Sequence, residues 1–253
     1  MPSDVARVVA LGASNLTRGF QTVVSTARSA WGREVEIVAA LGHGRSYGVP
    51  SRFIIRTLPG ILASGLWRHL ESRRPVPTRA LVTDIGNDIL YGFSVEQTLR
   101  WTAEAIERLH EFTDDIVLTG LPLSGIRALS RPKFLAFRSL IVPSCRLSLS
   151  QILQASEQVN DGLAALAASR SIQFFPLNPD WYGFDPIHIR PSQWRPAWQE
   201  ILGAGSALGP RAGRREGLAL YFTPPERQWL LGKEQYTPQT GAQLDSGARL
   251  WLY

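Results

Sequence analysis

Short apolar runs alternate with helix-like segments along most of the chain, and this alternation constrains the fold more than any other feature. Five runs have the length and apolar content of buried strands, at residues 7–12, 35–42, 80–85, 116–121 and 172–177. Strands that alternate with helices form a parallel sheet with helices on both of its faces. The sequence therefore predicts an α/β fold with three layers, α/β/α, around a five-stranded parallel, flavodoxin-like sheet.

Apolar residues at helical spacing separate these runs. We expect helices over residues 15–31, 61–73, 149–168 and 191–202, and a further helix that begins after Ser94. The helix after Ser94 has the clearest start, because Ser94 and Gln97 match the capping-box pattern.

The composition changes after Leu202. Residues 203–217 are rich in glycine, arginine and small residues, which is typical of a linker. Residues 218–253 contain short β-like runs (LALYF, RQWLLG, ARLWLY) between proline and glycine turns. We therefore predict a main domain over residues 1–202, a linker over 203–217 and a small β extension over 218–253. So small a β unit needs to dock on the main domain to be stable.

Charge and cysteine content exclude several function classes. The net charge is +6, but the arginines are scattered and no zinc-finger or aromatic RNA-binding pattern accompanies them, so no nucleic-acid partner is predicted. The lone Cys145 excludes an internal disulfide and a cysteine-cluster metal site. No apolar run reaches the roughly 18 residues of a membrane span, and no secretory signal is visible. These features favour a cytoplasmic protein.

Polar and glycine residues follow the predicted strands at the points where the strands end. Ser14, Gly44, Asn87 and the Asp185–His188 loop each come after a different strand. Ligands of parallel sheets bind beyond the carboxyl ends of the strands. We therefore expect these four segments to meet in space.

Each segment has a catalytic and an ordinary interpretation. Ser14 stands at the start of a helix, where backbone N–H groups favour developing negative charge, but a serine there is also a common N-cap. Asp185 and His188 could supply an oriented base for a serine nucleophile, or could belong to an unremarkable surface loop. Asn87 could donate into an oxyanion hole, or could simply form a turn. His43 is disfavoured as the base because no carboxylate lies near it in the sequence.

Taken together and in order, the four segments resemble the SGNH hydrolase superfamily of GDSL-like esterases and lipases. Its four blocks contribute Ser, Gly, Asn and His in that order. The matching residues here are Gly12-Ala13-Ser14-Asn15-Leu16, Gly44, Gly86-Asn87-Asp88 and Asp185-Pro186-Ile187-His188. Many relatives read GDSL or GDSI in the first block, so Ala13 replaces the usual aspartate. Gly42 competes with Gly44 for the second block, and Gly44 is favoured because Gly44-Arg45-Ser46 better resembles the family's run.

The resemblance implies a serine esterase or acyl hydrolase that works through an acyl-enzyme on Ser14. His188 is the implied base and Asp185 orients it. The backbone N–H groups of Ser14 and Gly44 and the side chain of Asn87 form the implied oxyanion hole. No metal or organic cofactor is implied. An acyltransferase with the same triad, or a non-catalytic module that keeps the fold, are the alternatives.

The sequence says less about the substrate than about the reaction. The implied partner is a small-molecule, glycan or lipid ester. Candidate substrate-binding residues are Trp181, Tyr182 and Phe184, which directly precede the Asp185–His188 loop, and Arg45. The three aromatic residues could equally be core packing, and Arg45 could belong to a solvated basic face. Residues 124–147, which include Phe134, Phe137 and Ile141, are a candidate cap over the site.

Overall fold

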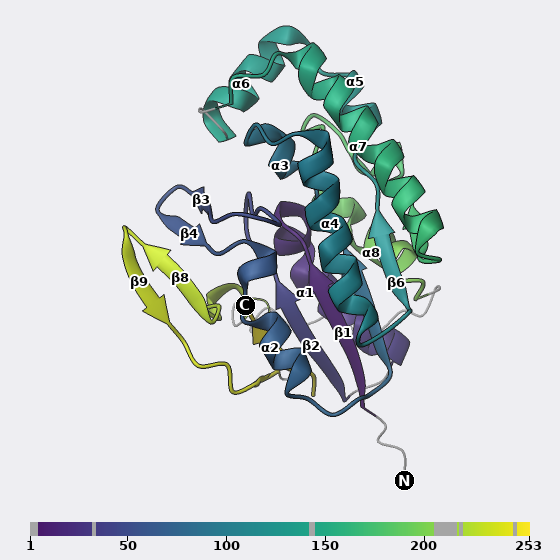
Figure 1. Cartoon of the computed structure of the whole chain (residues 1–253), viewed down its shortest axis with the longest axis vertical. Coiled ribbons are helices and arrows are strands. Elements are labelled where there is room, and N and C mark those ends of the chain that lie inside the picture. Colours follow the sequence, from purple (N-terminus) through teal and green to yellow (C-terminus); the bar gives the residue numbers. More distant parts are fainter. Residues whose placement is uncertain (1–4, 32–33, 142–144, 205–216, 218–219, 245–246) are drawn as a thin grey trace.

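A seven-stranded sheet runs through the molecule and helices cover both of its faces (Figure 1). The computed structural model describes residues 5–31, 34–141, 145–204, 217, 220–244 and 247–253. The predicted α/β class with a parallel central sheet is confirmed. The predicted number of five strands is wrong, because two strands from the end of the chain add to the sheet.

The five predicted strands form the parallel part of the sheet. Their order is β2-β1-β5-β6-β7, and the pairing of Val8 with Ile37 illustrates the register of β1 and β2. Their bounds are β1 (Ala6–Leu11), β2 (Val35–Ala40), β5 (Thr78–Val82), β6 (Ile116–Thr119) and β7 (Gln173–Phe175).

The helices divide between the two faces. α1 (Ser14–Trp31) and α8 (Trp194–Ile201) cover one face, and α2 (Leu66–Glu71), α4 (Val95–His110) and α7 (Leu149–Ser169) cover the other. Three short helices lie at the upper end of the molecule in Figure 1, namely α3 (Asn87–Leu90), α5 (Leu123–Arg127) and α6 (Arg131–Ile141). Single 3-10 turns complete the set: η1 (Ile61–Ala63), η2 (Pro179–Trp181) and η3 (Pro191–Gln193).

Alternate residues of each strand enter two separate cores. Val9 and Leu11 of β1 pack with the α4 and α7 side chains, whereas Val8 and Ala10 pack with those of α1 and α8. All four are fully buried. A strand covered on both faces needs apolar residues at every position, which is why the runs are continuous and not alternating.

Two helices start as their sequence indicates. Ser94 accepts a hydrogen bond from the backbone N–H of Gln97 at the start of α4. Ser148 forms a complete capping box with Gln151 at the start of α7. Within the described ranges, no helix has both the length and the apolar content needed to cross a bilayer.

The end of the chain completes two sheets. β11 (Arg249–Leu252) lies parallel to β2, with Leu250 opposite Ile37, and β10 (Ala242–Gln243) pairs antiparallel with β11. β8 (Arg227–Leu230) and β9 (Lys233–Tyr236) join β3 (Ser51–Phe53) and β4 (Arg56–Leu58) in a four-stranded antiparallel sheet. The strands β8 to β11 thus join the rest of the fold by sheet pairing.

Two further predictions concern residues 203–222. The β-like run at 218–222 is wrong where it is described, because residues 220–222 are helical. Most of the predicted linker, residues 205–216, lies outside the described residues.

Candidate active site

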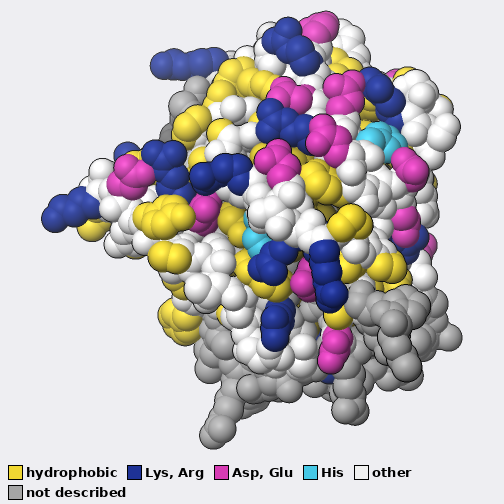
Figure 2. Space-filling view, turned by 60° about the horizontal axis from the view of Figure 1, so that its bottom comes forward, with side chains coloured by type: hydrophobic (Ala, Val, Ile, Leu, Met, Phe, Trp, Pro, Cys, Tyr) yellow, Lys and Arg dark blue, Asp and Glu magenta, His cyan; other side chains and the backbone are white. Residues whose placement is uncertain are grey.

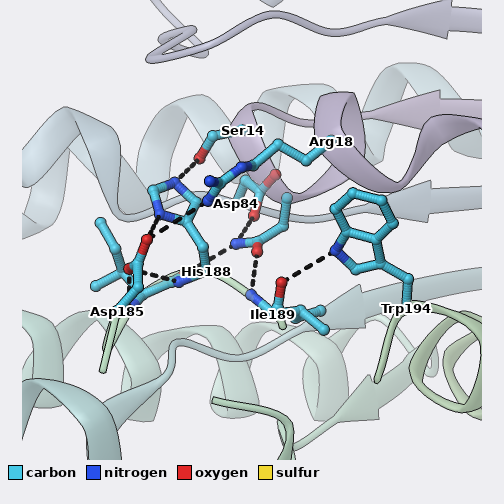
Figure 3. A network of polar contacts seen from close by, with 9 residues as sticks. Ser14, Arg18, Asp84, Asp185, His188, Ile189 and Trp194 are labelled. Carbon is cyan, nitrogen blue, oxygen red and sulfur yellow. Dashed lines mark hydrogen bonds and ion pairs between the residues drawn. The ribbon is translucent and has the colours of Figure 1, made fainter. Parts of the chain in front are cut away.

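The structure brings Ser14, His188 and Asp185 into one hydrogen-bonded relay (Figure 3). The Oγ atom of Ser14 lies 2.9 Å from Nε2 of His188, and Nδ1 of His188 lies 2.7 Å from Oδ2 of Asp185. Ser14 is the first residue of α1, directly after β1. Its hydroxyl, which as an N-cap would turn toward the helix, contacts the imidazole.

The Asp185 carboxylate is shared between the imidazole and the loop backbone. Its Oδ1 atom accepts the N–H groups of Ile187 and His188 at 3.2 Å each. Burial alone raises the pKa of Asp185, but the His188 hydrogen bond and charge, with the two backbone bonds, bring it below its ordinary value. Arg18, one turn after Ser14 on α1, places its Nη1 atom 3.5 Å from Oδ2 of Asp185. The carboxylate therefore stays ionised while it orients the ring.

Asp84 supplies the support that Ala13 cannot. It follows β5, and its Oδ2 atom accepts the backbone N–H groups of Ala13 and Leu16 at 3.0 Å each. Its Oδ1 atom accepts a hydrogen bond from Nδ2 of Asn15 at 2.9 Å. Asp84 has a φ of 61°, a left-handed conformation that aspartate tolerates better than most residues. A carboxylate that follows a different strand thus braces the turn that carries Ser14.

Asn15 connects this turn to the histidine loop. Its Nδ2 atom also donates to the carbonyl of Ile187 at 2.9 Å, and its Oδ1 atom accepts the N–H of Ile189 at 2.8 Å. The two residues that flank His188 are therefore tied to the residue that follows Ser14. This clamp sets the position of the imidazole relative to the hydroxyl.

Hydrogen bonds join the Gly44 segment to the Asn87 segment. They come from α3 and from the residue that follows it. Nδ2 of Asn87 donates to the carbonyl of Arg45 at 3.3 Å, and the Tyr91 hydroxyl donates to the carbonyl of Gly44. Gly44 has a φ of 65°, whereas Gly42 is not in the left-handed region, so Gly44 is the glycine that this turn requires.

Asp88 adds a buried carboxylate to the same junction. It accepts hydrogen bonds from the Ser46 hydroxyl and from the Tyr47 backbone N–H, the latter at 3.2 Å. Burial raises the pKa of Asp88 to about 6, against the lowering effect of these two hydrogen bonds.

With this geometry in place, comparison with known proteins becomes informative. No protein-family model and no curated protein matches the sequence. Solved structures match it over most of its length. Est24, a carbohydrate acetylesterase from Sinorhizobium meliloti, gives a TM-score of 0.54 at 14% identity, covering 78% of this chain and 97% of its own. The native M. smegmatis aryl esterase gives 0.53 at 14% identity, covering 80% and 100%.

A third similar structure is that of a G-D-S-L family protein. A member of the lipolytic G-D-S-L family from Veillonella parvula DSM 2008 gives a TM-score of 0.50 at 14% identity, covering 80% of this chain and 100% of its own. The chain has the SGNH hydrolase fold. At these identities the likeness concerns the fold, so the chemistry rests on the site itself.

A largely apolar pocket opens beside Ser14 in this SGNH fold. It encloses about 910 Å³, including the open space at its mouth. The candidate cap, residues 124–147, contributes Ile126, Leu129, Phe134 and Arg138 to its wall. The side chains of Phe137 and Ile141 lie outside the described residues. The wall also includes Ser14, Asn15, Asp84, Asn87, Leu90, Leu121, Ile152 and Ile187.

The predicted role of Arg45 in substrate binding is wrong. Arg45 is fully buried, and its guanidinium donates to the carbonyls of Pro59 at 3.0 Å, Leu41 at 3.2 Å and Tyr253. Burial lowers its pKa to about 9. The side chain points into the protein, where its hydrogen bonds hold the segment that contains Gly44. It is therefore out of reach of a substrate.

The three predicted aromatic residues do not line the pocket either. Trp181 and Tyr182 are buried in the core beneath α1 and α8, and the ring of Trp181 stacks on Phe175 at 6.0 Å. Phe184 is 78% exposed, and the Lys133 amine lies 4.4 Å above its ring. Of the two interpretations, core packing applies to Trp181 and Tyr182.

Sequence reasoning missed the carboxylates at 84 and 88 and the hydroxyl of Tyr91. Asp84 was visible as the one charged residue in the run 80–85, which is apolar apart from Thr83 and Asp84, and a charged residue in such a run is a signal for a partner. His43 stacks on Phe53 at 5.0 Å, and burial with the charges of Arg18 and His188 lowers its pKa. In the described part of the chain, no three His, Cys, Asp or Glu side chains gather to hold a metal ion.

Replacing Asp84 tests its bracing role. In Asp84→Ala the N–H groups of Ala13 and Leu16 lose their acceptor, so Ser14 shifts relative to His188. We expect kcat for an activated ester to fall by about 10²-fold with little change in KM, since small displacements of a nucleophile have effects of this size. Asp161→Ala, on the exposed face of α7, is the matched control and should leave kcat unchanged. Equal rates for Asp84→Ala and wild type would contradict the bracing role.

The raised pKa of Asp88 predicts a pH-dependent stability. Between pH values of about 4 and 6, the folded protein binds more protons at this site than the unfolded chain. Its contribution to the free energy of unfolding therefore falls as pH rises through that window, by about 3 kcal/mol for a shift of about two units. Asp88→Asn removes this titration. Denaturant unfolding of both proteins across the window measures it, and a constant difference between them would exclude it.

Proposed function

We propose that this protein is a serine esterase that cleaves a carboxylic ester through an acyl-enzyme on Ser14. The observation that carries the proposal is the relay of 2.9 Å from Ser14 to His188 and 2.7 Å from His188 to Asp185. A serine hydroxyl becomes a nucleophile when a base lies within hydrogen-bond reach and a third group orients that base. The relay meets both requirements without a cofactor.

In the proposed mechanism, Ser14 attacks the ester carbonyl as His188 takes its proton. Asp185, held ionised by its hydrogen bonds, stabilises the imidazolium that forms. His188 then gives the proton to the departing alcohol. Water, activated by His188 in the same way, releases the acid and regenerates the free serine.

We assign stabilisation of the oxyanion to three donors, namely the backbone N–H groups of Ser14 and Gly44 and the side-chain amide of Asn87. Nδ2 of Asn87 carries two hydrogens, and within the described part of the chain its one acceptor is the carbonyl of Arg45. The second hydrogen is free to donate to the negative oxygen that develops in the transition state. The contacts of Asp88 and Tyr91 hold both donor segments in place.

The apolar pocket beside Ser14 is proposed to receive the acyl group. Its wall of Leu129, Phe134 and Ile152 offers aliphatic and aromatic contacts and few hydrogen-bond partners for a chain longer than acetyl. The proposed substrate is therefore an ester of an aliphatic acid, with a small-molecule, glycan or lipid alcohol.

Two substitutions test the nucleophile and the oxyanion donor. Ser14→Ala should abolish hydrolysis of p-nitrophenyl butyrate and labelling by a fluorophosphonate probe. Asn87→Ala should lower kcat by about 10²–10³-fold while labelling persists at a reduced rate. Ser169→Ala, an exposed serine on α7, is the control, and thermal unfolding reports whether each variant folds. If the probe still labels Ser14→Ala, Ser14 is not the nucleophile.

A series of p-nitrophenyl esters tests the acyl pocket. Each added methylene that the pocket buries contributes about 0.8 kcal/mol, so kcat/KM should rise roughly fourfold per carbon from acetyl upward. Leu129→Trp narrows the pocket and should flatten this rise while acetyl ester hydrolysis stays near the wild-type rate. A wild-type rate independent of chain length would place the acyl group elsewhere without affecting the assignment of Ser14.

A further inference from the structure

Three aliphatic side chains project into solvent at the tips of two neighbouring hairpins. Ile54 and Ile55 join β3 to β4 and are 73% and 49% exposed, and Leu231 joins β8 to β9 and is 74% exposed. The N–H of Leu231 donates to the carbonyl of Ile55 at 2.9 Å, so both tips lie side by side. We call these three residues the apolar tip.

Two residues of the apolar tip have a backbone conformation that is unfavourable for their residue types. Ile54 has a φ of 55° and Leu231 a φ of 51°. Hairpin turns normally place Gly, Asn or Asp in this left-handed region, and a β-branched residue there is an outlier. Neither side chain gains core packing in return. Folding therefore does not account for aliphatic residues at these positions, which points to a contact outside the chain.

Two exposed basic residues, Arg52 and Lys233, lie next to the apolar tip in the two hairpins. The two hairpins, residues 51–58 and 227–236, carry Arg52, Arg56, Arg227 and Lys233 against one carboxylate, Glu234. Glu234 pairs with Arg227. Among the described residues no carboxylate forms an ion pair with the exposed Arg52 or Lys233. Figure 2 shows basic and hydrophobic side chains together over the lobe that projects at the left of the view.

The β3–β4 hairpin, which carries part of the apolar tip, contacts the segment that precedes Gly44. Phe53, the residue before Ile54, stacks on His43 at 5.0 Å. His43 directly precedes Gly44, whose backbone N–H is a proposed oxyanion donor. A surface that held the apolar tip would therefore lie beside the hairpin that contacts the Gly44 segment.

We propose that the apolar tip inserts into the surface of an anionic lipid bilayer, with Arg52 and Lys233 against the headgroups. Peripheral proteins bind bilayers by combining shallow insertion of apolar side chains with attraction of basic residues to anionic lipids. A protein partner fits less well, because three side chains on a convex tip are far short of the roughly 800 Å² per partner that a stable interface buries.

Vesicle sedimentation tests the proposal in the Ser14→Ala background, where lipid esters stay intact and binding is measured without any hydrolysis. The Ser14→Ala protein should bind vesicles of phosphatidylcholine with phosphatidylserine more tightly than phosphatidylcholine alone, and added salt should weaken this binding. Adding Ile54→Asn with Leu231→Asn should lower binding by about tenfold or more, since two inserted aliphatic side chains are lost. Adding Arg52→Gln with Lys233→Gln should remove the preference for phosphatidylserine.

The asparagine pair keeps the fold testable, because asparagine tolerates positive φ and the thermal midpoint should not fall. The matched control is Leu135→Gln, which replaces a 49% exposed aliphatic residue on α6 and should bind vesicles like the Ser14→Ala parent. The proposal is overturned if the parent does not bind phosphatidylserine vesicles, or if the asparagine pair binds them equally well. It is also overturned if sedimentation shows a dimer that the asparagine pair abolishes while vesicle binding is absent. None of these results bears on the acyl-enzyme at Ser14.

Discussion

The rest of the site depends on the hydrogen bonds that the carboxylate of Asp84 accepts. It binds two backbone N–H groups around Ser14 and the side chain of Asn15, which in turn binds both neighbours of His188. Three segments that are far apart in the chain are thereby fixed by one charged group. These hydrogen bonds hold the segments in register, and the Oγ atom of Ser14 then lies 2.9 Å from Nε2 of His188.

A second set of contacts links the opposite side of the site to the end of the chain. Arg45 is buried beneath the Gly44 turn and binds the carbonyl of Tyr253, which continues from β11. The carbonyl of Arg45 binds the amide of Asn87. The last strand therefore braces the proposed oxyanion donor as well as widening the sheet. This explains why the fold places a fully buried guanidinium, which is costly to desolvate, next to the segment proposed to stabilise the oxyanion.

The sequence correctly predicted the α/β fold with its parallel central sheet and the meeting of Ser14 with the Asp185–His188 loop, and the failures have a common cause. Continuous apolar runs identify strands covered on both faces, and the residues after them meet at one sheet edge. The errors concern side chains whose direction depends on packing. Arg45, Trp181 and Tyr182 point into the protein and not toward the pocket. The pairing of β11 with β2 was also invisible, because strand partners distant in sequence leave no local signal.

By itself the sequence determined the alternation of strands and helices and the order of the four segments that contain the proposed catalytic residues. Periodicity and turn chemistry are local, so they can be read along the chain. Only the tertiary structure decided that Asp84 replaces the aspartate missing at Ala13, and that helices α5 and α6 enclose an apolar pocket. Both are long-range: Asp84 reaches Ala13 across 71 positions, and its side chain has a partner only once β5 lies beside β1.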